Sequence, residues 1–110
     1  CTDNDIKVEY NYEINAEMMK RGNVYLMLNG QLGLGLVEIA RMAKLQGLEI
    51  GKDIGIISYN DSYLSEIILG GLTTVSTDFE QMGNLAADMV LTRDLRKVKC
   101  DFELKRRNTF

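Results

Sequence analysis

Small polar side chains follow three apolar runs of this sequence, at the point where each run ends. The runs close at Leu28, Ser58 and Ser76. Neutral amides and hydroxyls offer paired hydrogen-bond donors and acceptors, which suit a polyhydroxylated ligand better than a phosphate or a metal ion. We therefore predict a ligand-binding site made by five residues, namely Asn29, Tyr59, Asn60, Asp61 and Thr77.

Patterns typical of enzymes and metal sites are missing from the sequence. It contains no histidine, and its two cysteines, Cys1 and Cys100, lie at opposite ends, so it offers neither a Ser-His-Asp triad nor a zinc cluster. A dinucleotide fingerprint that began at Gly33 and Gly35 would need its third glycine at Glu38, where a carboxylate would oppose the pyrophosphate. We expect no enzyme activity, no metal and no cofactor.

Composition narrows the class of protein further. With 13 basic and 16 acidic side chains and a pI near 4.9, the chain lacks the positive charge that DNA binding requires. No run of 18 apolar residues and no signal segment is present, and cysteine is scarce, so we expect a cytoplasmic protein that does not enter a membrane. Because the chain starts with cysteine, we also expect it to be a piece of a longer protein.

Hydrophobic periodicity predicts strands and helices that alternate along the chain. It favours strands over residues 6–12, 24–28, 54–58, 72–76 and 100–104. It favours helices over residues 16–22, 36–47 and 79–91. This alternation indicates an α/β fold, a parallel sheet wrapped by helices on right-handed crossovers. The carboxyl ends of parallel strands meet at one edge, where ligands bind, so we expect the candidate residues to lie close together.

Each candidate also has a simpler local role that its position allows. Residues 60–62 can form a turn that bonds its own backbone, and Asn29 and Asp78 can cap the helices that follow them. Tyr59 can be a half-buried packing residue, and the basic residues 105–107 can be a solvated end. These alternatives stay open at the level of the sequence.

The helix expected over residues 79–91 carries a continuous apolar stripe. Its members are Phe79, Met82, Leu85, Ala86, Met89 and Val90. Leaving such a stripe in water is costly, and an exposed patch of this size normally finds a partner. We therefore expect the helix to fold back on the sheet or to pair with a second copy, giving a homodimer.

Three separated blocks of the sequence keep the order and spacing of a known family. They read GLEIGKDIGIISYNDS, GGLTTVSTDFEQMGNLAADMVL and FELKRRNTF. From about Gly22 to its end, the chain resembles the C-terminal part of the effector-binding domain of LacI/GalR-type bacterial transcription regulators. The first block is most similar to the subgroup that carries a GntR-type winged helix, as in arabinose-repressor-like proteins.

The resemblance implies one lobe of a two-lobed, type I periplasmic-binding-protein-like domain. Its interlobe cleft would hold a sugar or related metabolite, and its closure would change operator DNA affinity through an N-terminal domain absent from these residues. Asn29, Asn60 and Thr77 fall at family positions that reach the ligand. Ser58 replaces a glycine, Asn60 replaces an aspartate, and Gly30 replaces an acidic residue, which changes the charge of the site.

Two other functions share parts of this pattern. A lobe of a sugar-binding protein that serves a transport system would have the same fold and cleft. A response-regulator-like or nucleotide-binding domain would also be α/β, but the sequence lacks its acidic cluster and its phosphate loop. The expected function is therefore ligand sensing in a sugar-responsive transcription regulator, with the transport lobe as the alternative.

Overall fold

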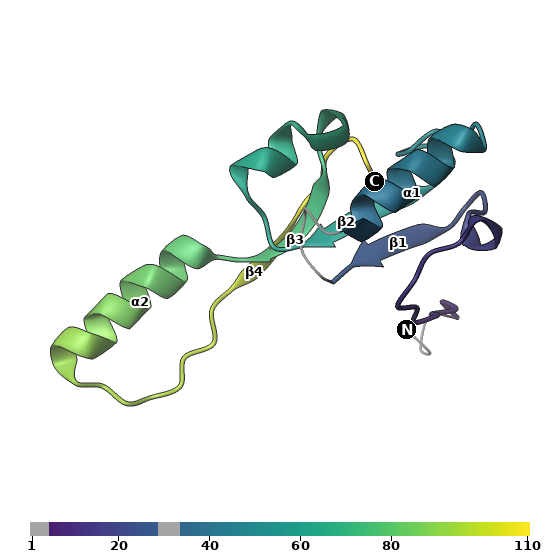
Figure 1. Cartoon of the computed structure of the whole chain (residues 1–110). Helices are drawn as coiled ribbons and strands as arrows, with labels where there is room; N and C mark the ends of the chain where they lie inside the picture. The colour runs from purple at the N-terminus through teal and green to yellow at the C-terminus, as the bar shows by residue number, and fades with distance from the viewer. Residues whose placement is uncertain (1–4, 29–33) are drawn as a thin grey trace.

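A computed structural model of the chain describes residues 5–28 and 34–110 (Figure 1). Its regular elements are one four-stranded sheet, two α-helices and three short 3-10 helices in the described ranges. In chain order they are η2 (Ala16–Met18), β1 (Val24–Met27), α1 (Leu34–Leu45), β2 (Gly55–Tyr59), η3 (Tyr63–Glu66), η4 (Ile68–Gly70), β3 (Thr73–Thr77), α2 (Phe79–Thr92) and β4 (Phe102–Lys105).

The sheet has the strand order β1-β2-β3-β4. Strands β1, β2 and β3 are parallel, as predicted, with Met27 opposite Ser58 and Tyr59 opposite Val75. The strand predicted at the end of the chain forms as β4, but it runs antiparallel to β3. The expectation of a wholly parallel sheet is wrong here because α2 does not cross the sheet, so the chain returns alongside the strand it left.

The core lies between α1 and one face of the sheet. Helix α1 turns Leu36, Ile39 and Ala43 to that face at helical spacing, and all three are buried. They pack with Ile56 and Leu72 from the start of β2 and the approach to β3. The other sheet face is open, and the side chains along β1 alternate accordingly between exposed and half-buried. The open face carries Val24, Leu26, Phe102 and Leu104.

The strand expected over residues 6–12 is wrong. These residues belong to no strand, and Ile6, Val8, Tyr10 and Tyr12 are exposed. Alternating residues form a strand only where a neighbouring strand accepts their backbone hydrogen bonds and a core covers one face. The helix expected from Ala16 shortens to a single 3-10 turn, η2, although Asn15 caps it as predicted, accepting from the Glu17 and Met18 amides.

Helix α2 extends away from the sheet as an arm (Figure 1). The cap expected at Asp78 is confirmed, since its carboxylate accepts from the Gln81 amide at 2.9 Å. Gln81 then exchanges two hydrogen bonds with Asp101 on the returning segment, at 2.9 and 2.8 Å. These contacts hold the base of the arm in line with β3 and β4. Of the two outcomes expected for this helix, folding back on the sheet is therefore wrong, and Phe79 and Val90 of the stripe are exposed. Pairing with a second copy stays a prediction.

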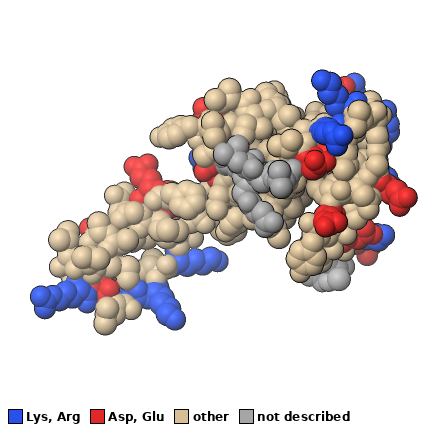
Figure 2. Space-filling model, viewed as in Figure 1, with Lys and Arg blue, Asp and Glu red and all other residues tan. Residues whose placement is uncertain are grey.

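The surface of the molecule reflects this shape. Its accessible area is 8583 Å², whereas a folded monomer of 12.4 kDa typically exposes roughly 6,100 Å². On the face drawn in Figure 2, uncharged side chains cover most of the arm, and lysines and arginines gather at its far end. None of the helices in the described residues is long and apolar enough to cross a membrane.

Candidate ligand-binding site

The carboxyl ends of β1, β2 and β3 meet at one edge of the sheet because the three strands are parallel. Tyr59 ends β2, Asn60 and Asp61 follow it directly, and Thr77 ends β3. The structure therefore brings four of the five candidate residues to one edge. The fifth, Asn29, lies outside the described residues.

Tyr59 and Thr77 belong to the open face of the sheet. Tyr59 lies opposite Val75, and Thr77 follows two residues later on the same side of β3. Tyr59 is 42% exposed as a residue, so it is available to a ligand as well as to a packing partner. An aromatic ring combines an apolar face with a hydroxyl and suits the similarly mixed surface of a sugar.

Asn60 occupies the turn that leaves the sheet. Its backbone N–H donates to the Val75 carbonyl at 2.8 Å, so β2 stays bonded to β3 up to this residue. Its φ of 66° is left-handed, a conformation that asparagine tolerates better than most residues because its short amide bonds locally. Asn60 thus marks the exact point where the strand ends and the chain changes direction.

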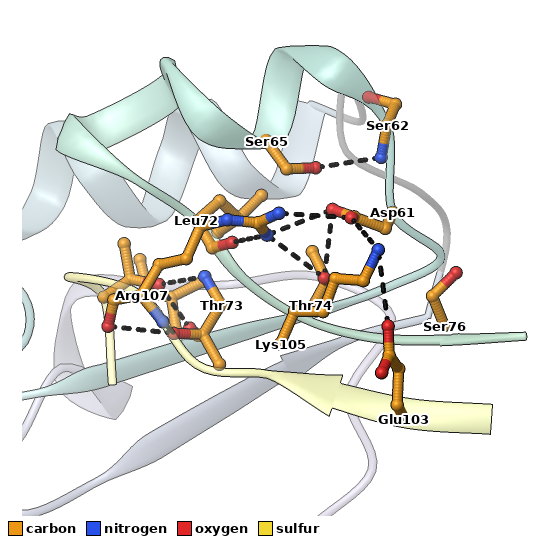
Figure 3. A network of polar contacts seen from close by, with 12 residues as sticks. Asp61, Ser62, Ser65, Leu72, Thr73, Thr74, Ser76, Glu103, Lys105 and Arg107 are labelled. Atoms are coloured by element: carbon orange, nitrogen blue, oxygen red, sulfur yellow. Dashed lines mark hydrogen bonds and ion pairs between the residues drawn. The ribbon is translucent and has the colours of Figure 1, made fainter. Parts of the chain in front are cut away.

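Asp61 is held by side chains far from it in the sequence (Figure 3). One carboxylate oxygen accepts from the Thr74 hydroxyl at 3.1 Å and from Nη1 of Arg107 at 3.0 Å. The other accepts from Nη2 of Arg107 at 3.1 Å and pairs with Nζ of Lys105 at 3.1 Å. These bonds engage both oxygens within the chain. Contact between Asp61 and a ligand stays a prediction.

Electrostatics keeps Asp61 charged. Burial alone would raise the pKa of its carboxyl group, since the side chain is only 13% exposed. Hydrogen bonds from Arg107, Lys105, Ser65 and Thr74 outweigh that effect and hold the pKa of Asp61 well below its usual range. Two cations face this one carboxylate, so its negative charge is compensated within the lobe.

The C-terminal segment is part of the folded unit. Thr109 is fully buried, and its hydroxyl donates to the Ile56 carbonyl at 2.8 Å and accepts from the Thr73 amide at 2.8 Å. The Arg107 side chain is 18% exposed. The expectation of a solvated basic end is therefore wrong for Arg107 and holds for Arg106, which is exposed.

Sequence reasoning missed Arg107 as a partner of the site. A usable signal was present, because Lys105, Arg107 and Thr109 continue the period of two that begins in β4. That spacing places all three on one side of an extended segment. It does not say which residue they meet, since Asp61 is 46 positions away from Arg107.

Two further observations limit what the site can do. Among residues 5–28 and 34–110, no group of histidine, cysteine, aspartate or glutamate could hold a metal ion. The Ser58 hydroxyl is fully buried and has no hydrogen-bond partner in the described part of the chain. It lies one residue before Tyr59 and adds no polar contact at the edge. Tyr59, Asn60 and Thr77 offer neutral hydrogen-bonding groups at the edge, and Asp61 is the charged residue beside them.

Comparison with known proteins agrees with the α/β fold. Residues 26–99 match the periplasmic binding protein-like domain family. The chain is 30% identical to the lactose operon repressor of Escherichia coli (strain K12) over 83 residues, which are 73% of this chain and 22% of the repressor. It is 35% identical to the HTH-type transcriptional regulator KdgR of Bacillus subtilis (strain 168) over 79 residues, 72% of this chain and 22% of the regulator.

A solved structure of the Lac repressor bound to ONPG, in the repressed state, has the same fold. It superposes with a TM-score of 0.59 at 27% identity, over 79% of this chain and 27% of that one. The chain thus spans about a quarter of the length of these relatives. Because the family match covers well over half of its residues, the chain belongs to the periplasmic binding protein-like domain family, among the effector-binding domains of LacI/GalR-type transcription regulators.

Proposed function

We propose that this chain is one lobe of the ligand-sensing domain of a sugar-responsive transcription regulator. The observation that carries the proposal is the edge that β1, β2 and β3 share. There Tyr59 ends β2, Asn60 follows it, and Thr77 ends β3. Related proteins support it, since they include the lactose operon repressor and the structure of a Lac repressor bound to ONPG.

The ligand class follows from the charge of the edge. Tyr59, Asn60 and Thr77 are neutral donors and acceptors, and Arg107 and Lys105 neutralise Asp61. Lys105 also pairs with Glu103 at 3.4 Å, so two cations face two carboxylates in this cluster. A phosphorylated or strongly charged ligand would find no free counter-charge among these groups. A neutral sugar would find one hydrogen-bonding partner for each of several hydroxyls, with Asn29 as a fourth neutral contact.

A second lobe accounts for the surfaces that this chain leaves open. The accessible area exceeds that of a folded monomer of this mass, and the apolar stripe of α2 is largely exposed. We infer that residues 1–110 form the C-terminal lobe of a longer, two-lobed domain and that α2 packs in the other lobe. A ligand that bridges both lobes would favour the closed form and so shift the population between two DNA affinities.

The remaining parts of the proposal concern the whole protein. Operator DNA would bind an N-terminal domain. The similarity of the block GLEIGKDIGIISYNDS to the GntR-linked subgroup favours a winged helix for that domain. The protein would act in the cytoplasm as a homodimer, as operator symmetry favours. A transport protein with the same lobe is the alternative, and the regulators found among the relatives do not favour it.

The test removes the central amide. In the polypeptide as the gene encodes it, Asn60→Leu should weaken binding by about 1 to 3 kcal/mol, because a ligand hydroxyl loses its partner on burial. Calorimetry with D-glucose, D-galactose and L-arabinose measures this, and Asn11→Leu, in the exposed N-terminal segment, is the matched control. Equal affinity of Asn60→Leu and the parent for a sugar that binds would contradict the proposal.

A further inference from the structure

We propose that Arg107 is a positioning residue of the candidate ligand site: through Asp61, it fixes the turn that carries Asn60. The effect on a ligand rests on the function proposed above. The effect on the turn does not, and it can be measured on this chain without any ligand.

The turn needs support on both sides. Before Asn60, the hydrogen bond from its amide to the Val75 carbonyl holds the chain to β3. Asn60 itself is in the left-handed region, where a residue with a side chain persists only if its surroundings hold it there. After Asn60 the chain leaves the sheet, and the next residue, Asp61, is held by side chains of β3 and of the C-terminal segment.

Asp61 is anchored mainly by Arg107. The guanidinium makes two parallel hydrogen bonds to the carboxylate, one to each oxygen. The same Nη1 also donates to the Leu72 carbonyl at 2.8 Å and to the Thr74 hydroxyl at 3.3 Å. Arg107 therefore ties the turn after β2 to the approach and start of β3 in a single side chain (Figure 3).

The backbone of Arg107 is in turn held by Thr73. Its amide donates to the Thr73 hydroxyl at 2.9 Å, and its carbonyl accepts from the same hydroxyl at 3.2 Å. Two residues on, buried Thr109 bonds to β2 and β3. The backbone that carries the Arg107 side chain is thus fixed against β2 and β3 on the side where the guanidinium meets Asp61.

Lysine cannot replace this function. An ammonium is a compact point charge, whereas the planar fork of arginine matches both carboxylate oxygens at once. Lys105 already supplies one ammonium to Asp61, at 3.1 Å, and its side chain is 44% exposed. A second ammonium at position 107 would preserve the charge of the cluster but not the bonds to Leu72 and Thr74.

The first experiment measures order in the turn. In the ¹⁵N-labelled chain, Arg107→Lys should lower the backbone order parameters of residues 60–62 from about 0.85 to below about 0.6, and leave those of α1 unchanged. Arg106→Lys is the matched control, since the Arg106 guanidinium reaches Phe110 and not Asp61. Its Nε donates to the Phe110 carbonyl at 3.0 Å, and its Cζ lies 5.6 Å from the centroid of the Phe110 ring. Unchanged order at residues 60–62 in Arg107→Lys would overturn the proposal.

A second variant covers the case in which Arg107→Lys does not fold. Asp61→Asn keeps the shape of the side chain and removes the charge that Arg107 recognises. It should loosen the same three residues and no others. A rigid turn in folded Asp61→Asn would also overturn the proposal.

The ligand readout separates this inference from the proposed function. In the full-length polypeptide, Arg107→Lys should bind the sugar that the parent binds roughly tenfold more weakly, the scale of one charge-assisted hydrogen bond, while Arg106→Lys matches the parent. A loosened turn with unchanged affinity would support the positioning and overturn the role of Asn60. If Asn60→Leu loses affinity while Arg107→Lys keeps both its affinity and a rigid turn, the role of Asn60 is supported and the positioning by Arg107 is overturned.

Discussion

Helices α1 and α2 each carry an apolar stripe at helical spacing, yet only α1 packs against the sheet. Leu36 and Ile39 of the α1 stripe are 4% and 0% exposed, whereas Phe79 and Val90 of the α2 stripe are 51% and 77% exposed. Amphipathicity therefore predicts that a helix has a face to bury. It does not predict that this chain contains the surface that buries it.

The connections of the two helices explain the difference. Helix α1 links two parallel strands, β1 and β2, so the chain must cross over the sheet and the helix lies on its face. Helix α2 links β3 to the antiparallel β4, a connection that requires no crossing. The bonds among Asp78, Gln81 and Asp101 then keep the arm in line with its two strands.

The largest expected effect comes from matched leucines in the two helices. Leu36→Ala should lower the free energy of unfolding by about 2 to 5 kcal/mol, because it leaves a cavity in the core. Leu91→Ala should change it by less than about 0.5 kcal/mol, because the side chain is already in water. Urea denaturation of this chain measures both, and similar losses would mean that the arm is packed in solution.

Acid should lower the free energy of unfolding through Asp61. The pKa of Asp61 is depressed on folding, so its stabilisation is present at neutral pH, above the usual aspartate pKa of about 3.9, and is lost as pH falls through the folded value. Stability should therefore decline below about pH 4. Asp61→Asn should be less stable at pH 7 and decline less steeply in acid. Parallel pH profiles of parent and variant in urea titrations would refute this.

The smallest effect on folding should come from the stripe of α2. Met82, 42% exposed, lies on the arm, so Met82→Glu should change the unfolding free energy by less than about 0.5 kcal/mol. If the stripe pairs with a second copy, the parent should scatter light with twice the mass of the 12.4 kDa chain and the variant should not. A parent that stays monomeric at high concentration would show that this chain does not cover its own stripe by pairing.

Local sequence was sufficient for the strands and α-helices from residue 24 onward and for two caps. The apolar runs that end at Leu28, Ser58 and Ser76 form the three parallel strands. Asn15 caps η2, and Asp78 caps α2. The edge at which Tyr59, Asn60 and Thr77 gather was predictable as well. The elements and caps depend on residues within a few positions of one another, and periodicity and capping report such short-range relations directly. The edge was predictable because alternating strands and helices indicate parallel strands, whose carboxyl ends meet.

Only the tertiary structure decided the rest. The alternating residues 6–12 found no strand to pair with, β4 turned antiparallel, and the stripe of α2 met no core. Arg107 met Asp61 across 46 positions of sequence. Each outcome depends on which distant segments come within bonding distance, and a hydrophobic pattern or a single charge specifies the need for a partner without specifying where that partner lies.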